Sequence, residues 1–231
     1  MSRENNNTVM PMWATPVLRK KFEQHQTVNS ELVKIFQEHR RANDKIHGPV
    51  YSSPDDLLSR YGDTAINDLF KFISDSVYEI ASSVNGPMWE QSNSSKINMN
   101  VVGAWFQIQN NFGFHDVHTH GNCSWSGAYY VQVDEEEKRI AHPQLGEQNG
   151  VTRFYSPYED VLGGGYMDSG NLYLQASTFD SKPEEGVLVV FPSYLKHMAL
   201  PYQGDKDRII VSFNVQIHGD QGNDVLPYGF Y

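Results

Sequence analysis

The segment HDVHTH, residues 115–120, places three histidines and one acidic residue within six positions. In an extended chain, residues i and i+2 point to the same side about 6.6 Å apart, so His118 and His120 can converge on one ion. Asp116 would share that face, whereas His115 would point the other way. Imidazole is a ligand for iron, zinc, copper and nickel. The segment therefore predicts a metal site, with Asp116 as an alternative ligand.

His197 is a third candidate ligand, because it follows the apolar run GVLVVF and the turn-like sequence PSYLK. A histidine just after a buried strand can be held opposite another strand, as a facial metal site requires. Three neutral nitrogen ligands would leave positions open for a substrate or for oxygen. The chain has nine histidines, so surface-loop or hydrogen-bonded core histidines are the alternative interpretation.

Arg208 begins the run RIIVSFNVQI, in which apolar and more polar residues alternate. One face would carry Ile209, Val211, Phe213, Val215 and Ile217, and the other Arg208, Ile210, Ser212, Asn214 and Gln216. The second face looks either at water or into a wet barrel interior. A buried arginine needs an anion, and its planar guanidinium matches a carboxylate. A surface arginine paired with Asp205 or Asp207 is equally compatible with the sequence.

The elements that position these residues change in type along the chain. Residues 63–87 carry apolar residues at steps of three and four, which predicts a helix that ends at Asn85-Gly86-Pro87, and a shorter helix is expected from near Asn29 or Ser30. From about residue 98, short aromatic and β-branched runs predict strands: NVVGAWFQI, WSGAYYVQV, TRFYS, NLYLQA, GVLVVF and RIIVSFNVQI. The pattern predicts a mainly β protein, an antiparallel sandwich or barrel with N-terminal helices on an outer face.

The amino-acid composition indicates which binding partners and which cellular compartment the protein can have. The 231 residues suit one core, and the formal charge of -10 argues against a nucleic-acid or anionic-membrane surface. The single cysteine, Cys123, excludes an internal disulfide framework. We find no export signal and no apolar run of the roughly 20 residues that a membrane span needs. We therefore expect a soluble, cytoplasmic protein.

Three segments, FGFHDVHTHGNCSWSGAYYVQV, GVLVVFPSYLKHMALPY and DRIIVSFNVQI, resemble in order and spacing the motifs of 2-oxoglutarate- and Fe(II)-dependent oxygenases of the small bacterial and phage type. The opening MPMWATPVLRKKF is similar to their usual start. The resemblance implies a double-stranded β-helix, a jelly-roll or cupin-like barrel that binds iron near one open end. The expected organisation is a single domain over 1–231, with a helical layer over about 1–95 and a jelly-roll core over about 96–231.

The resemblance implies an iron site in which His118 and His197 are ligands. His120 would supply or border the remaining protein ligand, although most members of this superfamily carry Asp or Glu at its position. A three-histidine site, a two-histidine site and a site that uses Asp116 therefore all stay open.

The resemblance also implies a cosubstrate site. Arg208 would bind the distal carboxylate of 2-oxoglutarate, although many relatives have a serine where Ile210 stands. Tyr129 and Asn214 are expected to hydrogen-bond the cosubstrate, with core packing as an equal alternative for Tyr129. Such a dioxygenase couples the oxidative decarboxylation of 2-oxoglutarate to succinate with oxidation of a C–H bond, here of an unidentified peptide or small molecule.

Two other functions fit parts of the sequence. A cupin-type metal enzyme would not use 2-oxoglutarate, but the glutamate expected after the histidine pair is replaced by Cys123, Ser124 and Trp125, and Tyr194 replaces a glycine. A non-catalytic jelly-roll binding protein would carry no metal and would use surface aromatics such as those of YGFY. The sequence predicts neither the prime substrate nor the oligomeric state.

Overall fold

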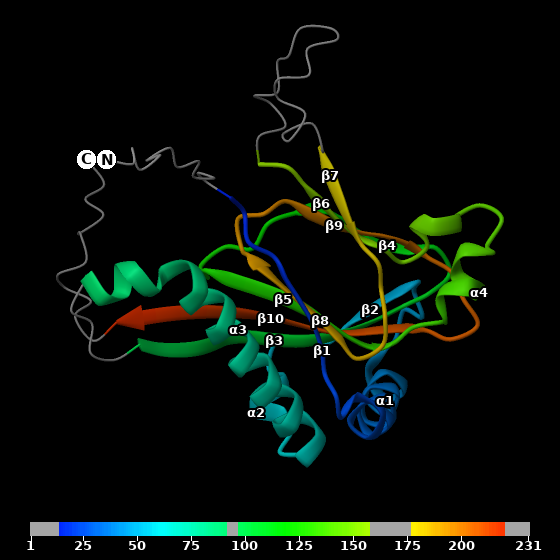
Figure 1. Ribbon diagram of the computed structural model, residues 1–231. Coiled ribbons are helices and arrows are strands. Elements are labelled where there is room, and N and C mark those ends of the chain that lie inside the picture. The colour runs from blue at the N-terminus through cyan, green and yellow to red at the C-terminus, as the bar shows by residue number, and fades with distance from the viewer. Residues whose placement is uncertain (1–13, 92–96, 158–176, 220–231) are drawn as a thin grey trace, which may run out of the picture.

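The computed structural model describes residues 14–91, 97–157 and 177–219. Two antiparallel sheets lie one above the other, and helices cover the outer side of the larger sheet (Figure 1). The architecture is the mainly β sandwich with N-terminal helices that the sequence predicts. The predicted run NLYLQA, residues 171–176, lies outside the described residues.

The larger sheet has six strands in the order β1-β8-β5-β10-β3-β2. They are β1 (Leu18–Lys21), β8 (Val187–Pro192), β5 (Trp125–Gln132), β10 (Arg208–Gly219), β3 (Ile97–Gln109) and β2 (Val50–Ser52). β10 lies between β5 and β3, so both of its edges are hydrogen-bonded along most of its length. The predicted strands NVVGAWFQI, WSGAYYVQV, GVLVVF and RIIVSFNVQI correspond to β3, β5, β8 and β10 and are confirmed.

The smaller sheet has four strands in the order β4-β9-β6-β7. They are β4 (Gly113–His118), β9 (His197–Tyr202), β6 (Thr152–Tyr155) and β7 (Thr178–Ser181). The predicted strand TRFYS corresponds to β6, whereas β4, β7 and β9 were not among the predicted strands. His118 and His197, at the end of β4 and the start of β9, are therefore neighbours across one sheet.

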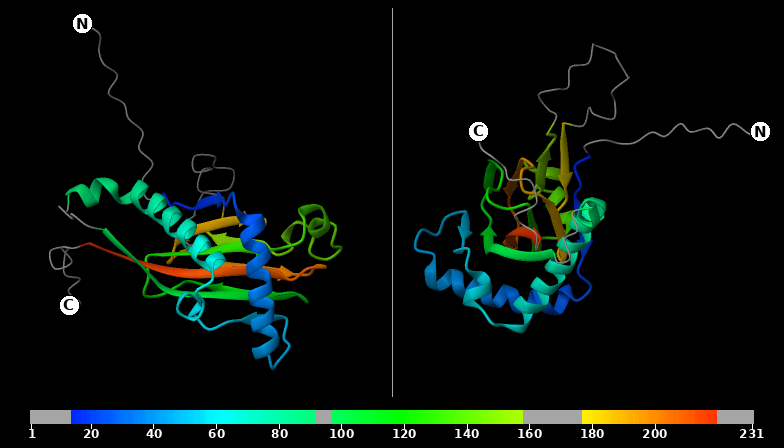
Figure 2. Two further views of the ribbon diagram at one scale, coloured as in Figure 1. Left: turned by 90° about the horizontal axis from the view of Figure 1, so that it is seen from below. Right: turned by 90° about the vertical axis from the view of Figure 1, so that its left-hand side faces the viewer.

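Helices α1 (His25–Asn43) and α3 (Thr64–Gln91) pack on the outer face of the larger sheet (Figure 2). Phe36 of α1 stacks on Phe106 of β3 with ring centroids 4.2 Å apart. The largest buried cluster joins these helices to the predicted apolar face of β10, which includes Ile209, Val211, Phe213 and Val215. The shorter elements are α2 (Leu57–Arg60), α4 (Glu136–Ile140) and the 3-10 helix η1 (Gly146–Gln148).

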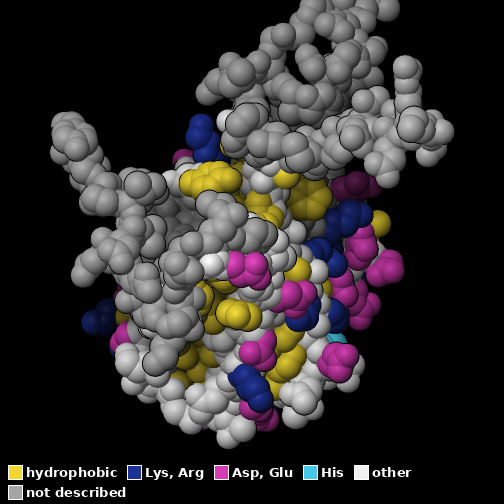
Figure 3. Space-filling view, turned by 60° about the vertical axis from the view of Figure 1, so that its left-hand side comes forward, with side chains coloured by type: hydrophobic (Ala, Val, Ile, Leu, Met, Phe, Trp, Pro, Cys, Tyr) yellow, Lys and Arg dark blue, Asp and Glu magenta, His cyan; other side chains and the backbone are white. Residues whose placement is uncertain are grey.

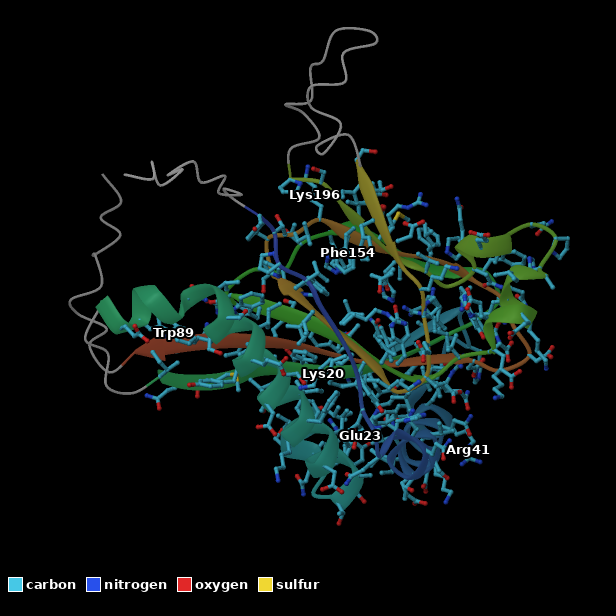
Figure 4. All side chains as sticks on the ribbon, in the orientation of Figure 1. Lys20, Glu23, Arg41, Trp89, Phe154 and Lys196 are labelled. Atoms are coloured by element: carbon cyan, nitrogen blue, oxygen red, sulfur yellow. The ribbon has the colours of Figure 1, made fainter. Side chains whose placement is uncertain are left out.

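A second, smaller core fills the space between the two sheets. Phe154 of β6, labelled in Figure 4, packs there with Phe191 of β8 and Ile210 of β10. Arg208 lies two residues before Ile210 and on the same face of β10. The polar face of β10 therefore looks into the interior of the sandwich, which resolves the choice that the sequence left open.

Three local predictions were wrong. α3 does not end at Asn85-Gly86-Pro87 but continues to Gln91, because Gly86 keeps a negative φ and Trp89 packs against the core (Figure 4). The first third is also not a purely helical layer, since β1 and β2 pair with β8 and β3 of the larger sheet. The helix expected from Asn29 or Ser30 begins earlier, at His25.

Charges of both signs are mixed on the described surface, as the face in Figure 3 shows. The one basic cluster of the sequence is neutralised, because Arg19 and Lys21 pair with Glu184 and Lys20 pairs with Glu79. Within the described residues, no helix is long and apolar enough to cross a bilayer.

Candidate metal centre

An irregularity in β4 decides which of its side chains face the interior. His115 pairs with Ala199 of β9, and His118 pairs with His197, so a step of three residues on β4 opposes a step of two on β9. Such a bulge reverses the expected alternation of side chains. His115 and His118 therefore face the same side, and the expectation that His115 points away from the site was wrong.

Three histidines come together at one end of the sandwich. Their nitrogen atoms, one from each of His118, His120 and His197, all lie within 4.8 Å of one another. The Nε2 atoms of His120 and His197 are 3.4 Å apart. Two nitrogens that bind one ion at about 2.1 Å each are about 3.0 to 3.4 Å apart. His120 and His197 therefore have the separation of two ligands of one ion, and the ring nitrogen of His118 lies within 4.8 Å of both.

Backbone carbonyls fix the ring orientation of two of these histidines. Nδ1 of His118 lies 2.6 Å from the carbonyl oxygen of Asp116, and Nδ1 of His197 lies 2.9 Å from that of Leu195. A carbonyl only accepts, so Nδ1 carries the proton in both rings and Nε2 keeps its lone pair. This arrangement is typical of metal-binding histidines, whose other ring nitrogen is tied down by a backbone carbonyl or carboxylate.

His120 lies just beyond β4 and is held by a different contact. Its backbone N–H donates to the carbonyl of Ser193 at 2.9 Å, and its ring lies 6.1 Å from that of Trp105. Burial lowers the pKa of His120 and of His197 to about 4. Both rings are therefore neutral at neutral pH, as a nitrogen ligand must be.

Asp116 does not join the cluster. Its side chain is exposed, and its Oδ1 accepts a hydrogen bond from the backbone N–H of Val117 at 2.7 Å. The histidines alone make up the group of potential ligands found among the described residues. The alternative in which Asp116 replaces a histidine is thus not supported, and three imidazoles are a donor set that fits iron, zinc, copper or nickel.

Arg208 is buried between the sheets, with only 1% of its surface exposed. Nη1 donates to Oε1 of Gln109 at 2.8 Å, Nη2 donates to Oγ1 of Thr152 at 3.4 Å, and the guanidinium lies 5.1 Å from the ring centroid of Tyr130. No ion pair among the described residues involves Arg208, and its Nε has no partner. The predicted surface alternative, pairing with Asp205 or Asp207, is wrong because the side chain points inward.

The two other predicted cosubstrate residues differ in position. Tyr129 lies in the core beneath the helices, where its hydroxyl donates to Oδ1 of Asn29 at 2.7 Å, so the alternative of core packing holds for it. Asn214 lies on the same face of β10 as Arg208, and its Oδ1 accepts from Oγ of Ser126 at 2.9 Å. Asn214 therefore borders the interior of the sandwich, whereas Tyr129 does not.

Tyr130, Gln109 and Thr152, which surround Arg208, were not predicted from the sequence. The hydroxyl of Tyr130 lies 2.8 Å from Oγ1 of Thr152, and Gln109 is fully buried opposite Arg208 in the pairing of β3 with β10. The adjacent tyrosines of β5 point to opposite faces, and their sequence does not say which one faces inward. Gln109 stands out in the sequence as a polar residue at the end of an apolar strand. That it lies opposite Arg208, however, follows only from the register of β3 with β10.

Residues 103–214 match the model of a family described as "Putative 2OG-Fe(II) oxygenase". No sequence among the curated proteins matches the chain. HygX from Streptomyces hygroscopicus, solved with nickel and 2-oxoglutarate bound, is 9% identical with a TM-score of 0.56, covering 87% of this chain and 82% of HygX. The non-heme alpha ketoglutarate dependent epimerase SnoN from nogalamycin biosynthesis is 10% identical with a TM-score of 0.55, covering 87% of this chain and 76% of SnoN. These likenesses show that the fold is the double-stranded β-helix.

Proposed function

We propose that this chain is a 2OG-Fe(II) oxygenase, as the family match of residues 103–214 supports, and that it uses Fe(II) and 2-oxoglutarate as that family does. It would hydroxylate a peptide or small-molecule substrate through an iron site formed by His118, His120 and His197. The family match favours this function over the cupin and the metal-free binding protein. The strands β1 and β2, which extend the larger sheet, support treating the chain as one domain.

One observation carries the proposal: the histidine cluster and the buried Arg208 face the same interior at a fixed spacing. On β9, His197 pairs with His118 on one side and Phe154 on the other, whereas Ala199 pairs with His115 and Thr152. Thr152 accepts a hydrogen bond from Arg208. The row through His197 and the row through Ala199 are two residues apart along β9, or about 6.8 Å. A five-carbon dicarboxylate can span this distance, with its 2-oxo end at the histidines and its distal carboxylate at Arg208.

The chain's own residues supply binding, orientation and exclusion of water. The carbonyls of Asp116 and Leu195 hold the Nδ1 protons, so the Nε2 lone pairs of His118 and His197 are presented to the ion. Phe191 covers His197 with ring centroids 4.6 Å apart, which keeps solvent from one side of the site. Fe(II) with 2-oxoglutarate supplies the oxidising chemistry when bound, and three protein ligands leave room for both the cosubstrate and oxygen.

Arg208 has the properties of a carboxylate clamp. Its Nε is buried without a partner, and no acidic side chain of the described part of the chain neutralises it. An isolated buried guanidinium is costly, so a ligand carboxylate would complete the site. The family and the mixed surface charge support a small-molecule or peptide substrate over a nucleic acid.

The proposal is tested by measuring succinate. Purified protein with Fe(II) and 2-oxoglutarate is incubated in air with size-fractionated pools of peptides or small metabolites, and succinate is quantified by NMR. We expect Fe(II)-dependent succinate formation that one pool increases, and no such formation by His197→Ala. Equal succinate from the wild type and His197→Ala, or none with any pool, would contradict the proposed function.

A further inference from the structure

We propose that His115 is a second binding residue of this site: its Nε2 donates a hydrogen bond to the distal carboxylate of the 2-oxo acid, opposite Arg208, and selects a dicarboxylate over a monocarboxylate. This inference rests on the proposed function and deepens it. In a regular strand His115 would point away from the interior, and the irregular pairing of β4 with β9 turns it inward.

The pairing of three strands places His115 beside the space between the sheets in which the cosubstrate would lie. His115 of β4 and Thr152 of β6 both pair with Ala199 of β9, so the three residues form one row across the smaller sheet. Paired residues point to the same face, and adjacent strands lie about 4.8 Å apart. Ala199 carries only a methyl group, which leaves space above it between His115 and Thr152. Arg208, which donates to Thr152, borders this space from the larger sheet.

The unpartnered polar atoms of the described residues point to the same place. The buried side-chain nitrogen or oxygen atoms without a hydrogen-bond partner are Nε2 of His115, Nε of Arg208 and Oγ of Ser181. Ser181 pairs with Thr152, so it belongs to the same row on the far side of Thr152. A buried polar atom without a partner costs free energy, and such atoms are rare. His115 and Ser181 thus lie in one row of the smaller sheet, and Arg208 reaches that row from the larger sheet through Thr152. The unpartnered atoms of His115 and Arg208, on either side of Ala199 and Thr152, indicate a polar ligand that the protein itself does not supply.

The chemistry of His115 suits a neutral donor rather than a second cation. Burial lowers the pKa of His115 to about 4, and the positive charge of Arg208 adds to this effect. A neutral imidazole with its proton on Nε2 can donate one hydrogen bond to a carboxylate. Arg208 then supplies the charge, and His115 supplies a directed bond from the other side of the Ala199 methyl.

The test compares two ligands that differ only at the distal end. 2-Oxoglutarate and 2-oxopentanoate share the chain length and the 2-oxo acid, but the second ends in a methyl group. Their affinities for the Ni(II)-loaded protein are measured by calorimetry, directly or by competition, for the wild type, His115→Phe and His115→Gln. Phe114→Ala is the matched control, because Phe114 is the exposed neighbour on the same strand. Metal content is measured for every variant.

We expect His115→Phe to bind 2-oxoglutarate roughly ten- to a hundredfold more weakly, the loss of one hydrogen bond to a charged group. Its affinity for 2-oxopentanoate and its metal content should not change. His115→Gln, which keeps an N–H donor, should recover part of the affinity, and Phe114→Ala should match the wild type for both ligands.

Two results would overturn the inference while leaving the proposed function intact. His115→Phe could bind 2-oxoglutarate as tightly as the wild type, or it could lose affinity for both ligands equally, which would indicate a merely structural role. A wild type that binds metal but not 2-oxoglutarate would instead overturn the proposed function, and the inference with it.

Discussion

Replacing Arg208 with methionine removes the charge while keeping an apolar side chain of similar length. In the structure Arg208 is 1% exposed, its guanidinium donates to Gln109 and Thr152, and no carboxylate of the described residues pairs with it. Charge-assisted hydrogen bonds to a ligand carboxylate would contribute about 1.5 to 3 kcal/mol. Their loss should weaken 2-oxoglutarate binding roughly ten- to a hundredfold.

The same substitution should not destabilise the free protein. Leaving Oε1 of Gln109 unpaired costs about 1 to 3 kcal/mol. Removing a buried and incompletely neutralised charge offsets this cost, because its desolvation penalty is several kcal/mol. We therefore expect the melting temperature of the ligand-free Arg208→Met variant to equal or exceed that of the wild type.

Thermal unfolding of the Ni(II)-loaded protein with and without 2-oxoglutarate measures both effects. At a ligand concentration of about 100 times its Kd, the wild type should gain about 2.7 kcal/mol. At that concentration a variant with a ten- to hundredfold higher Kd gains only about 1.4 to 0.4 kcal/mol. Arg208→Lys is the matched control, since it keeps the charge but loses the planar fork, and should lie between the two.

An Arg208→Met variant that 2-oxoglutarate stabilises as strongly as it stabilises the wild type would refute the role of the guanidinium as a carboxylate clamp. A large fall in the melting temperature of the ligand-free variant would also contradict it. That result would mean that the guanidinium serves the fold rather than the ligand.

Three further predictions follow from the described contacts. His120→Asp should retain one metal ion per chain by elemental analysis, because a carboxylate is a common ligand at this position; loss of the metal would show that only imidazole fits. Asn29→Ala should lower the free energy of unfolding in urea by about 1 to 3 kcal/mol, since it removes the buried partner of the Tyr129 hydroxyl, and an unchanged unfolding curve would count against this. Burial lowers the pKa of His115, His120 and His197 to about 4, so the unfolded metal-free chain binds more protons between about pH 6.5 and pH 4. The stability of the chelator-treated protein should therefore fall as the pH drops through this window, and a flat profile would contradict the burial of these rings.

The alternation of β10 could be predicted from the sequence because a long strand with one apolar face has only one register that buries that face. Ile209, Val211 and Phe213 lie beneath the helices as predicted, and Arg208 lies on the opposite face. The pairing of His118 with His197 also followed from local signals, a His-x-His pair and a histidine after a buried strand. These features depend on short-range patterns, which a single sequence records.

The features that could not be predicted depend on contacts between distant segments. The bulge that turns His115 inward is set by the pairing of β4 with β9, and no residue between Gly113 and His118 marks it. The choice between Tyr129 and Tyr130 depends on which face of β5 meets the helices. The continuation of α3 past Asn85-Gly86-Pro87 depends on the packing of Trp89 against the core. In each case tertiary packing overrides the local sequence signal.

The central claim is that three histidines and Arg208 bind iron and 2-oxoglutarate in one site, and an anaerobic titration tests it most directly. Fe(II) is added to the protein without oxygen, 2-oxoglutarate is then titrated in, and the weak visible charge-transfer band of the chelated complex is recorded. We predict a saturable band at one equivalent of iron for the wild type, no band for His118→Ala or His197→Ala, and a band that needs more 2-oxoglutarate to saturate for Arg208→Met. A wild type without the band, or a band that His118→Ala and His197→Ala retain, would contradict the account.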